Sequence, residues 1–185
     1  MNTVAIVGAG PLGRWLALGA VRAGYRVLLE DVMPANLHHA RESIRGELGP
    51  EALPAVDFVS TLEDAVREAD LVIDCVPDEL ESKLEILWLL DRMAPPRTVF
   101  ATPTTHLAID DLASCTYRPE KCVAIALAPM DLTANAGPEI VLRAAPEASE
   151  DAVALVCDFW MKLGFQPTVE SRANASAPGR SCGGK

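Results

Sequence analysis

The stretch Val4-Ala-Ile-Val-Gly8-Ala-Gly10-Pro-Leu-Gly13 lies near the start of the chain and decides its fold. Four apolar residues predict a short buried strand, and three glycines with the spacing G-x-G-x-x-G follow directly before a helical pattern. In that context Gly8 permits a tight turn, Gly10 lets the backbone approach a pyrophosphate, and Gly13 lets the helix pack closely on the strand. The stretch therefore predicts a strand–turn–helix unit that binds a dinucleotide.

The start of this helix is the predicted phosphate site. The first N–H groups of a helix have no partner inside the helix, and the helix dipole favours negative charge near them. Pro11 and Leu12 stand at that position. We therefore expect Pro11 and Leu12 to bind the cofactor together with the three glycines.

Two acidic residues at the end of the next apolar stretch indicate which dinucleotide is bound. Asp31 follows the predicted strand 26–30 and lies 18 residues after Gly13, close to the ~20 expected for a ribose-binding acid. A carboxylate accepts hydrogen bonds from a ribose 2′-hydroxyl and repels a 2′-phosphate, so we predict NAD rather than NADP. Asp31 is the first candidate and Glu30 the second; the alternative for either is an ordinary solvated carboxylate.

The rest of the chain alternates apolar strand-like segments with helical ones. Such a pattern predicts a mostly parallel sheet covered on both faces, which is an α/β fold of the doubly wound Rossmann type. In the helix expected over 80–93, Leu80, Leu84, Leu87 and Trp88 form one stripe that we expect to face the core. The expected strands are 3–7, 26–30, 56–60, 71–76, 98–101, 123–127 and 140–142, and the expected helices are 12–23, 35–48, 62–69, 80–93 and 150–163.

Composition excludes several classes of partner. The chain has 185 residues and a formal net charge of −10, which disfavours binding to nucleic acid or to an anionic membrane. No apolar run reaches the ~18–20 residues of a membrane span, and the first residues carry no positive charge typical of a secretory signal. The five cysteines are odd in number and widely spaced, which indicates reduced thiols in a cytoplasmic protein and no metal site.

The last fifteen residues differ from the rest of the chain. They contain three basic residues and no acidic, aromatic or large aliphatic residue. A segment with nothing to bury does not offset the entropy lost on ordering. We therefore expect one folded domain over 1–169 and a disordered tail over 170–185.

Beyond the glycine loop, the chain resembles one dehydrogenase family. The resemblance is carried by Leu62-Glu-Asp-Ala-Val-Arg-Glu-Ala-Asp70-Leu-Val-Ile-Asp74-Cys-Val-Pro-Asp78-Glu-Leu-Glu-Ser-Lys83, by Leu90-Asp-Arg-Met-Ala-Pro-Pro96 and by Phe100-Ala-Thr-Pro-Thr-Thr-His-Leu-Ala-Ile109. These stretches are similar to the NAD-binding domain of the L-3-hydroxyacyl-CoA dehydrogenases. The resemblance implies oxidation of the 3-hydroxyl of an acyl-CoA thioester or of another small 3-hydroxy acid, with NAD as the electron acceptor.

The resemblance also assigns roles to single residues. Asp31 falls on the family's ribose-binding acid, and Asp78 and Lys83 fall on an acid and a lysine that contact NAD. The alternative for Lys83 is a solvated helix lysine paired with Glu79. Thr105 falls on the family's active-site serine, within Pro103-Thr-Thr105 where the family usually has Asn-Thr-Ser. A threonine hydroxyl can hydrogen-bond a substrate oxygen, so Thr105 is the candidate catalytic residue.

The chain departs from the family where the family has its catalytic histidine. The family's His-Phe-Phe-Asn-Pro run corresponds here to Ala126-Leu-Ala-Pro-Met130, so Ala126 replaces the base. Glu139 falls near the carboxylate that orients that histidine, although a surface acid is the simpler interpretation. His106, beside Thr105, is a candidate displaced base, but an extended segment would point the two side chains in opposite directions. The sequence therefore disfavours His106.

The chain also lacks two features implied by the family. No apolar pattern after residue 169 continues into the family's C-terminal helical domain, and the segment between Asp31 and Val56 is short for the arm that helps hold CoA. We therefore expect the NAD-binding domain of a 3-hydroxyacyl-CoA dehydrogenase-like oxidoreductase, truncated or served by a separate helical domain, as a homo-oligomer or with that partner. The alternatives are a non-catalytic NAD-binding module, and a dehydrogenase of another small hydroxy acid that uses Thr105 or His106.

Overall fold

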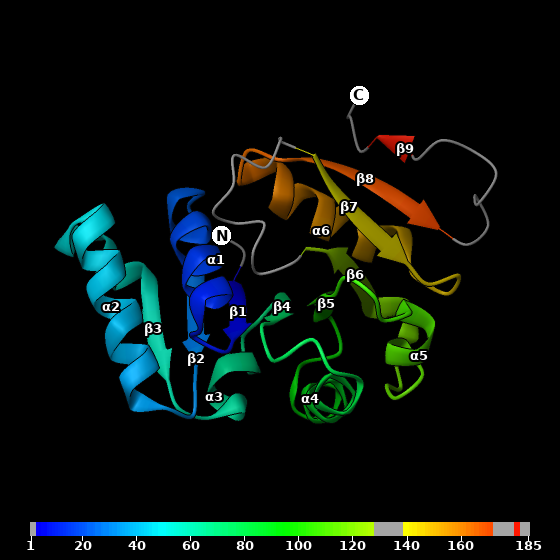
Figure 1. The fold of residues 1–185 in the computed structure, drawn as a ribbon, viewed down its shortest axis with the longest axis horizontal. Helices are drawn as coiled ribbons and strands as arrows, with labels where there is room; N and C mark the ends of the chain where they lie inside the picture. Colours follow the sequence, from blue (N-terminus) through cyan, green and yellow to red (C-terminus); the bar gives the residue numbers. More distant parts are fainter. Residues whose placement is uncertain (1–2, 128–138, 172–179, 182–185) are drawn as a thin grey trace.

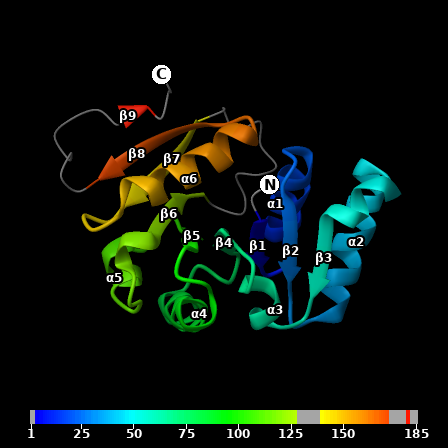
Figure 2. The ribbon, with the colours of Figure 1, turned by 180° about the vertical axis from the view of Figure 1, so that it is seen from behind.

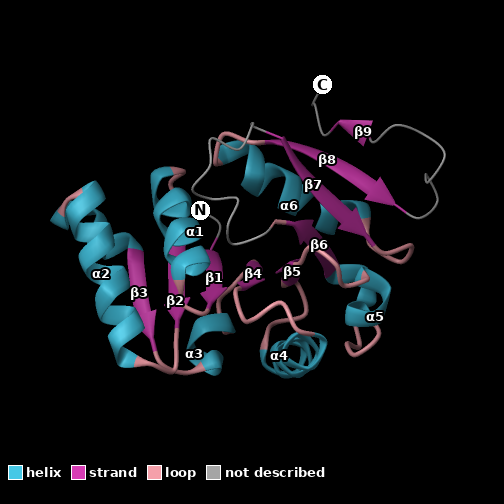
Figure 3. Ribbon diagram, in the orientation of Figure 1, coloured by secondary structure: helices cyan, strands magenta, loops and turns pink. Residues whose placement is uncertain are grey.

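The computed structural model describes residues 3–127, 139–171 and 180–181. In these residues one sheet carries helices on both of its faces (Figures 1 and 3). The strands are β1 (Thr3–Val7), β2 (Arg26–Glu30), β3 (Val56–Val59), β4 (Leu71–Asp74), β5 (Val99–Pro103), β6 (Cys122–Ala126), β7 (Glu139–Ala144), β8 (Gln166–Ser171) and β9 (Arg180–Ser181). The helices are α1 (Pro11–Arg22), α2 (Pro34–Leu48), α3 (Leu62–Val66), α4 (Leu80–Met93), α5 (Ile109–Ala113) and α6 (Glu150–Lys162), with 3₁₀ turns η1 (Pro50–Ala55) and η2 (Pro119–Lys121).

The strand order in the sheet is β3-β2-β1-β4-β5-β6-β7-β8-β9. Strands β1 to β6 are mutually parallel, β7 is antiparallel to β6, and β8 is parallel to β7. The chain moves from β1 to β2 and β3 on one side and then crosses to β4 on the other side (Figure 2). The order thus reverses between β1 and β4, which is where doubly wound sheets bind their ligands, at the carboxyl ends of the strands.

Two apolar clusters hold the helices on the sheet. The first contains alternating residues of the strands together with apolar residues of α1, α2 and α6, and the second contains the other strand residues with those of α3, α4 and α5. In β2, for example, Leu29 belongs to the first cluster and Leu28 to the second, because successive side chains of a strand point to opposite faces. Both faces of the sheet are therefore buried, as the continuous apolar strands predict.

The α/β Rossmann-type prediction is confirmed, with differences at several elements. Three segments have the predicted bounds: β1, β2 and α4. The sequence missed α5, which has five residues, and β8, which pairs with β7 over six residues. β8 ends at Ser171, and β9 pairs with it; the predicted tail otherwise lies outside the described residues, so the domain boundary at 169 stays a prediction.

The expected inward stripe of α4 is wrong in part. Leu80 and Trp88 are exposed, whereas Lys83, Leu87 and Leu90 are buried. The helix is therefore turned so that a lysine occupies a core position. This rotation determines the surroundings of Lys83, one of the candidate site residues.

Two chain-wide predictions are tested by the structure. Within the described residues, no helix is long and apolar enough to span a membrane. Cys75, Cys115 and Cys122 are free, as predicted. The prediction of reduced thiols is wrong for Cys157, which is disulfide-bonded; Cys182 lies outside the described residues.

Candidate functional site

The glycine loop joins β1 to α1 in a tight turn. Gly8 has φ +100°, a backbone conformation that residues with a side chain rarely adopt. Its N–H donates to the Glu30 carbonyl at 2.8 Å. A Cβ on Gly13 would lie 1.8 Å from the Gly8 carbonyl oxygen, so a larger residue does not fit there. These two contacts explain why the loop needs glycine at both positions.

The N-terminus of α1 is open on the ligand side. Gly10 is the N-cap residue, offers no side-chain acceptor to the first N–H groups, and has no atom within 4 Å of the position of an added Cβ. Pro11 is exposed, whereas the Leu12 side chain is buried in the first apolar cluster. The N–H groups at this end are therefore available to a phosphate, and Leu12 offers its backbone rather than its side chain.

Asp31 follows β2 and connects it to the glycine loop. Its Oδ2 accepts from the Ala9 N–H at 2.8 Å and from the Asn36 amide at 3.0 Å, and its Oδ1 accepts from the Met33 N–H at 2.7 Å. A carboxylate has about four acceptor positions, so these three bonds leave room for one further donor. Asp31 thus lies beside the loop, as a ribose-binding acid should.

Glu30 has different surroundings from Asp31. It is the last residue of β2, and only 3% of its surface is exposed. Burial, with a smaller effect of the Asp31 charge, raises the pKa of Glu30 to about 7. Asp31 is also buried, with 8% of its surface exposed, but its carboxylate contacts the Ala9 N–H of the glycine loop. That contact makes Asp31 the better candidate of the two for contact with a ribose.

A cavity of about 210 Å³ lies at the point where the strand order reverses. Its wall combines the glycine loop with the last residue of β5 and the segments that follow β4 and β6. The lining residues are Gly10, Pro11, Leu12, Cys75, Val76, Pro77, Asp78, Pro103 and Leu127. The cavity is smaller than the ~300–1,000 Å³ of most small-molecule pockets, so it holds only part of a dinucleotide.

Asp78 connects the segments after β4 and β5. Its Oδ2 accepts from the Thr105 N–H at 3.0 Å and from the Thr105 hydroxyl at 3.2 Å, and it lies 3.3 Å from Nδ1 of His106. Burial alone would raise the pKa of Asp78, but hydrogen bonds from Thr104 and Thr105 and the proximity of His106 outweigh it and lower that pKa. Asp78 is therefore an anion at neutral pH, and its Oδ1 has no partner among the described residues.

Lys83 lies in a different environment from both sequence-based interpretations. Its Nζ lies 2.6 Å from Oδ1 of Asp74, and both side chains are 1% exposed. Lys83 is therefore not a solvated lysine paired with Glu79. The Lys83 ammonium group is directed to Asp74, and the predicted contact between Lys83 and NAD stays a prediction.

The structure places Ala126 at the end of β6, beside β5, with part of its surface exposed. Residues 128–130, which complete the comparison with the family's histidine run, lie outside the described residues. Glu139 is the first residue of β7 and is exposed. Neither position supplies a histidine, so the base expected from the resemblance is missing at this strand end.

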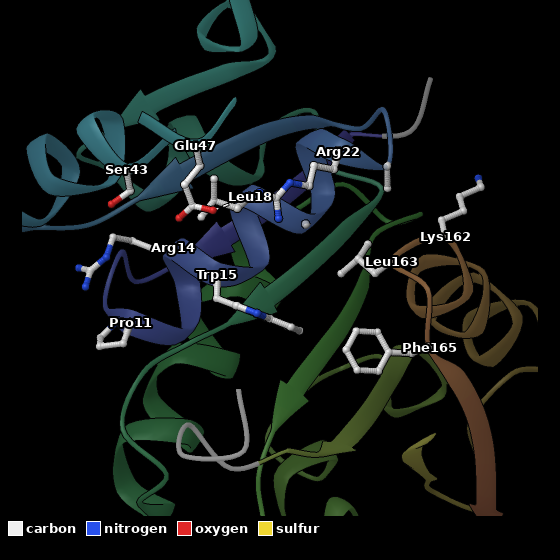
Figure 4. Close-up of a pocket in the computed structure, with 12 residues that line it drawn as sticks. Pro11, Arg14, Trp15, Leu18, Arg22, Ser43, Glu47, Lys162, Leu163 and Phe165 are labelled. Carbon is white, nitrogen blue, oxygen red and sulfur yellow. Dashed lines mark hydrogen bonds and ion pairs between the residues drawn. The ribbon is translucent and has the colours of Figure 1, made fainter. Parts of the chain in front are cut away.

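A second cavity, of about 440 Å³, lies between α1, α2 and the turn from α6 to β8. Figure 4 shows Trp15 and Phe165 on its wall, with Arg22 directed to Glu47. Of the candidate site residues only Pro11 lines this cavity. It is therefore separate from the contacts of Asp31, Asp78 and Thr105.

The arrangement at the first cavity fits a dinucleotide. The residues combine an open helix N-terminus, an acid beside it, and an unpartnered Asp78 oxygen at the cavity wall. Among the described residues no cluster of His, Cys, Asp or Glu could hold a metal ion. Two residues near the site were not predicted from the sequence: Asn36, whose amide donates to Asp31, and Asp74, which pairs with Lys83. No local sequence pattern indicates either contact.

Comparisons with known proteins agree with this geometry. A family model described as 3-hydroxyacyl-CoA dehydrogenase, NAD binding domain, matches residues 3–172. A probable 3-hydroxybutyryl-CoA dehydrogenase of Bacillus subtilis is 28% identical over 136 residues, which is 66% of this chain and 47% of that protein. The 5-formyl-3-hydroxy-2-methylpyridine 4-carboxylate 5-dehydrogenase of Mesorhizobium japonicum is 29% identical over 181 residues, which is 91% of this chain and 57% of that protein.

A solved structure extends the agreement to three dimensions. The 3-hydroxyacyl-CoA dehydrogenase of Archaeoglobus fulgidus matches with a TM-score of 0.78 and 26% identity, over 95% of this chain and 61% of that one. This chain spans about half the length of the curated relatives it matches. Because the family model covers most of the chain, the chain belongs to the 3-hydroxyacyl-CoA dehydrogenase family and contains its NAD-binding domain.

Proposed function

We propose that the chain binds NAD(H) in preference to NADP(H) and takes part in the oxidation of a small 3-hydroxy substrate. The observation that carries the proposal is the contact of Asp31 with the glycine loop, where its Oδ2 accepts from the Ala9 N–H at 2.8 Å. This contact supports an acid beside the ribose position, where it would bind hydroxyls and repel a 2′-phosphate.

The residues that would hold NAD divide into two groups. The N–H groups at the start of α1, framed by Gly8, Gly10 and Gly13, would bind the pyrophosphate, and Asp31 would accept from a ribose hydroxyl. Asp78 at the cavity wall would contact the other end of the cofactor through its free oxygen. Bound NAD supplies the acceptor for the two electrons and the hydrogen that leave the substrate carbon.

The substrate class rests on the relatives rather than on a pocket. The Bacillus subtilis relative is named for 3-hydroxybutyryl-CoA and the Mesorhizobium japonicum relative for a hydroxylated pyridine carboxylate. Both names describe small hydroxylated molecules, and only one contains CoA. We propose an acyl-CoA as the first substrate class to test, and a free 3-hydroxy acid as the second.

A non-catalytic NAD-binding module is the second candidate function. Ala126 favours it, because the end of β6 offers no side chain that accepts a proton. This candidate predicts NAD binding without turnover.

We further propose a cytoplasmic location, a cofactor domain over 1–169, and assembly with a second copy or a separate helical domain.

Calorimetric titration tests the cofactor proposal. We expect NADH to bind at least tenfold more tightly than NADPH, and Asp31→Asn to weaken NADH binding and reduce this preference. Asp111→Asn is the matched control, because Asp111 is an exposed acid in α5, away from the glycine loop. Tighter binding of NADPH, or equal NADH affinity in the Asp31 and Asp111 variants, would contradict the proposal.

A further inference from the structure

Three polar groups meet at the carboxyl end of β5. Nδ1 of His106 lies 3.2 Å from the Thr105 hydroxyl and 3.3 Å from Oδ2 of Asp78, and the same Oδ2 lies 3.2 Å from the Thr105 hydroxyl. We name these three residues the Asp78–Thr105–His106 group. Its members come from two segments of the chain, the one after β4 and the one after β5.

The two ring nitrogens of His106 have different surroundings. Nδ1 faces Asp78 and Thr105, while the side chain as a whole is 62% exposed. A carboxylate next to Nδ1 favours the tautomer that carries its proton there, which leaves a lone pair on Nε2. Nε2 can therefore accept a proton from a bound molecule.

The group borders the candidate cofactor cavity. Asp78 and Pro103 both line it, and Pro103 is the last residue of β5, two residues before Thr105. Arg143 of β7 also contacts this segment, with its Nη1 3.5 Å from the Thr105 carbonyl. The group thus lies on the side of the glycine loop opposite Asp31, across the reversal of strand order.

No other histidine lies at this edge of the sheet. The chain has three histidines, and the other two, His38 and His39, lie in α2. Oxidation of a hydroxyl requires a group that takes the hydroxyl proton. Since Ala126 cannot take it, His106 is the candidate, because the fold brings it to Asp78, which lines the cavity.

We propose that Nε2 of His106 takes the proton of the substrate hydroxyl and that Asp78 is the positioning residue that holds the ring. The proposal rests on the proposed NAD-dependent function. The substrate O–H bond breaks and its proton moves to Nε2, while the carbon loses its hydrogen with two electrons to the oxidised nicotinamide. The products are a carbonyl compound, the reduced cofactor and a proton that His106 releases to solvent.

The backbone after β5 removes the sequence argument against His106. Residues 105–107 form a bend rather than a continued strand, and the Leu107 N–H donates to the Thr104 hydroxyl at 3.1 Å. In an extended segment the side chains of Thr105 and His106 would point apart. The bend brings both of them to Asp78.

The first test measures the tautomer of His106 and needs no substrate. We expect ¹⁵N NMR at pH 8 to find the proton mainly on Nδ1, and we expect Asp78→Ala to shift it toward Nε2. His39→Gln serves to assign the signals and should leave the His106 signals unchanged. A proton mainly on Nε2 in the wild-type chain, or no change in Asp78→Ala, would overturn the positioning role.

The second test separates proton transfer from cofactor binding. With 3-hydroxybutyryl-CoA and with 3-hydroxybutyrate as probes, we expect His106→Gln to lower kcat by about 10²–10⁴-fold. We expect its NADH affinity to stay within threefold of wild type, and His39→Gln to keep full activity. Retention of kcat within threefold in His106→Gln, or an equal loss of NADH affinity and rate, would overturn the inference.

The two proposals fail in different ways. If the wild-type chain binds NADH but produces no NADH from NAD with either probe, the role of His106 is overturned and the cofactor proposal stands. A chain that binds no NADH in the calorimeter would overturn the proposed function itself. The NADH titration therefore distinguishes the two failures.

Discussion

Replacement of Lys83 by Met tests the buried ion pair beside the site. The Lys83 ammonium lies 2.6 Å from the Asp74 carboxylate, both side chains are 1% exposed, and the other Asp74 oxygen has no hydrogen-bond partner among the described residues. Met keeps most of the length of the lysine stem and removes the charge. Lys83→Met therefore leaves a buried carboxylate without its cation.

The expected cost is large for a single substitution. Removal of one partner of a buried ion pair costs about 3–5 kcal/mol, against a total stability of about 5–15 kcal/mol for a domain. For a chain of this length, each kcal/mol lowers Tm by about 2–4 °C, so we expect Tm to fall by roughly 6–20 °C. Urea denaturation followed by circular dichroism measures the same loss at 25 °C.

The loss should depend on pH. Burial raises the pKa of Asp74, and the Lys83 ammonium opposes that rise. Without the ammonium, the carboxyl group of the folded variant stays protonated to a higher pH than that of the unfolded chain. The folded variant then loses stability as pH rises above the ordinary pKa of an aspartate, so the deficit of Lys83→Met should be smaller at pH 5 than at pH 8.

Two further variants complete the test. Lys83→Met combined with Asp74→Asn removes both charges, and we expect it to recover at least half of the lost stability. Lys162→Met breaks an exposed pair with Asp158, and we expect a loss of at most ~1 kcal/mol. The reasoning fails if Lys83→Met costs no more than Lys162→Met at pH 8, or if the double variant is as unstable as Lys83→Met.

Three further substitutions test the loop, the acid of β2 and a helix cap. Gly13→Ala should lower the free energy of unfolding by about 2–3 kcal/mol and weaken NADH binding at least tenfold, because its Cβ would lie 1.8 Å from a carbonyl oxygen. Calorimetric titration should show no loss of NADH affinity for the control Gly46→Ala, where an added Cβ meets open space. Glu30→Gln should stabilise the fold at pH 8 by up to about 3 kcal/mol and by much less at pH 5. The reason is that the raised pKa of Glu30 makes the folded wild-type chain lose stability as pH rises from 4.5 to about 7. Thermal melts that show equal effects at pH 5 and pH 8 would refute this. Ser149→Ala should cost about 1 kcal/mol in urea titrations, because the Ser149 hydroxyl accepts from the Ala152 N–H, and an unchanged midpoint would mean that this cap is not needed.

The sequence predicts the fold well where local patterns and tertiary packing agree. The bounds of β1 and β2 follow from runs of apolar residues, and Gly8 and Gly24 mark the turns that end β1 and α1. The glycine loop is predictable because each glycine meets a steric demand set by its immediate neighbours. Short elements such as α5 escape prediction, because five residues are too few for a helical period to be visible.

The environment of Lys83 could not be predicted, because it depends on a partner in another element. A lysine in a helix is normally counted as part of the polar face, so the pattern of α4 put Leu80 and Trp88 inward. The structure instead buries Lys83 against Asp74 of β4. The sequence contains both residues, but their pairing follows from the packing of α4 on the second face of the sheet.

The orientation of His106 could not be predicted for a related reason. Alternation of side chains holds in an extended segment, and the prediction against His106 assumes that the chain stays extended through Thr105 and His106. The strand ends at Pro103, and the segment after it forms contacts of its own: the Leu107 N–H donates to the Thr104 hydroxyl, and Asp78 accepts from the Thr105 N–H. The bend at residues 105–107 thus brings His106, which strand geometry disfavours as a candidate base, to Asp78.

The buried ion pair and the Asp78–Thr105–His106 group are joined by one short segment. Asp74 ends β4, Lys83 lies in the first turn of α4, and the segment between them contains Asp78. The ion pair therefore fixes the two ends of the segment that carries Asp78 to Thr105 and His106. If this is so, the double variant that lacks both charges should fold yet let Asp78 move, and the His106 tautomer should then shift toward Nε2 as in Asp78→Ala. An unchanged tautomer in a stably folded double variant would mean that Thr105 and the cavity wall position Asp78 without help from Lys83.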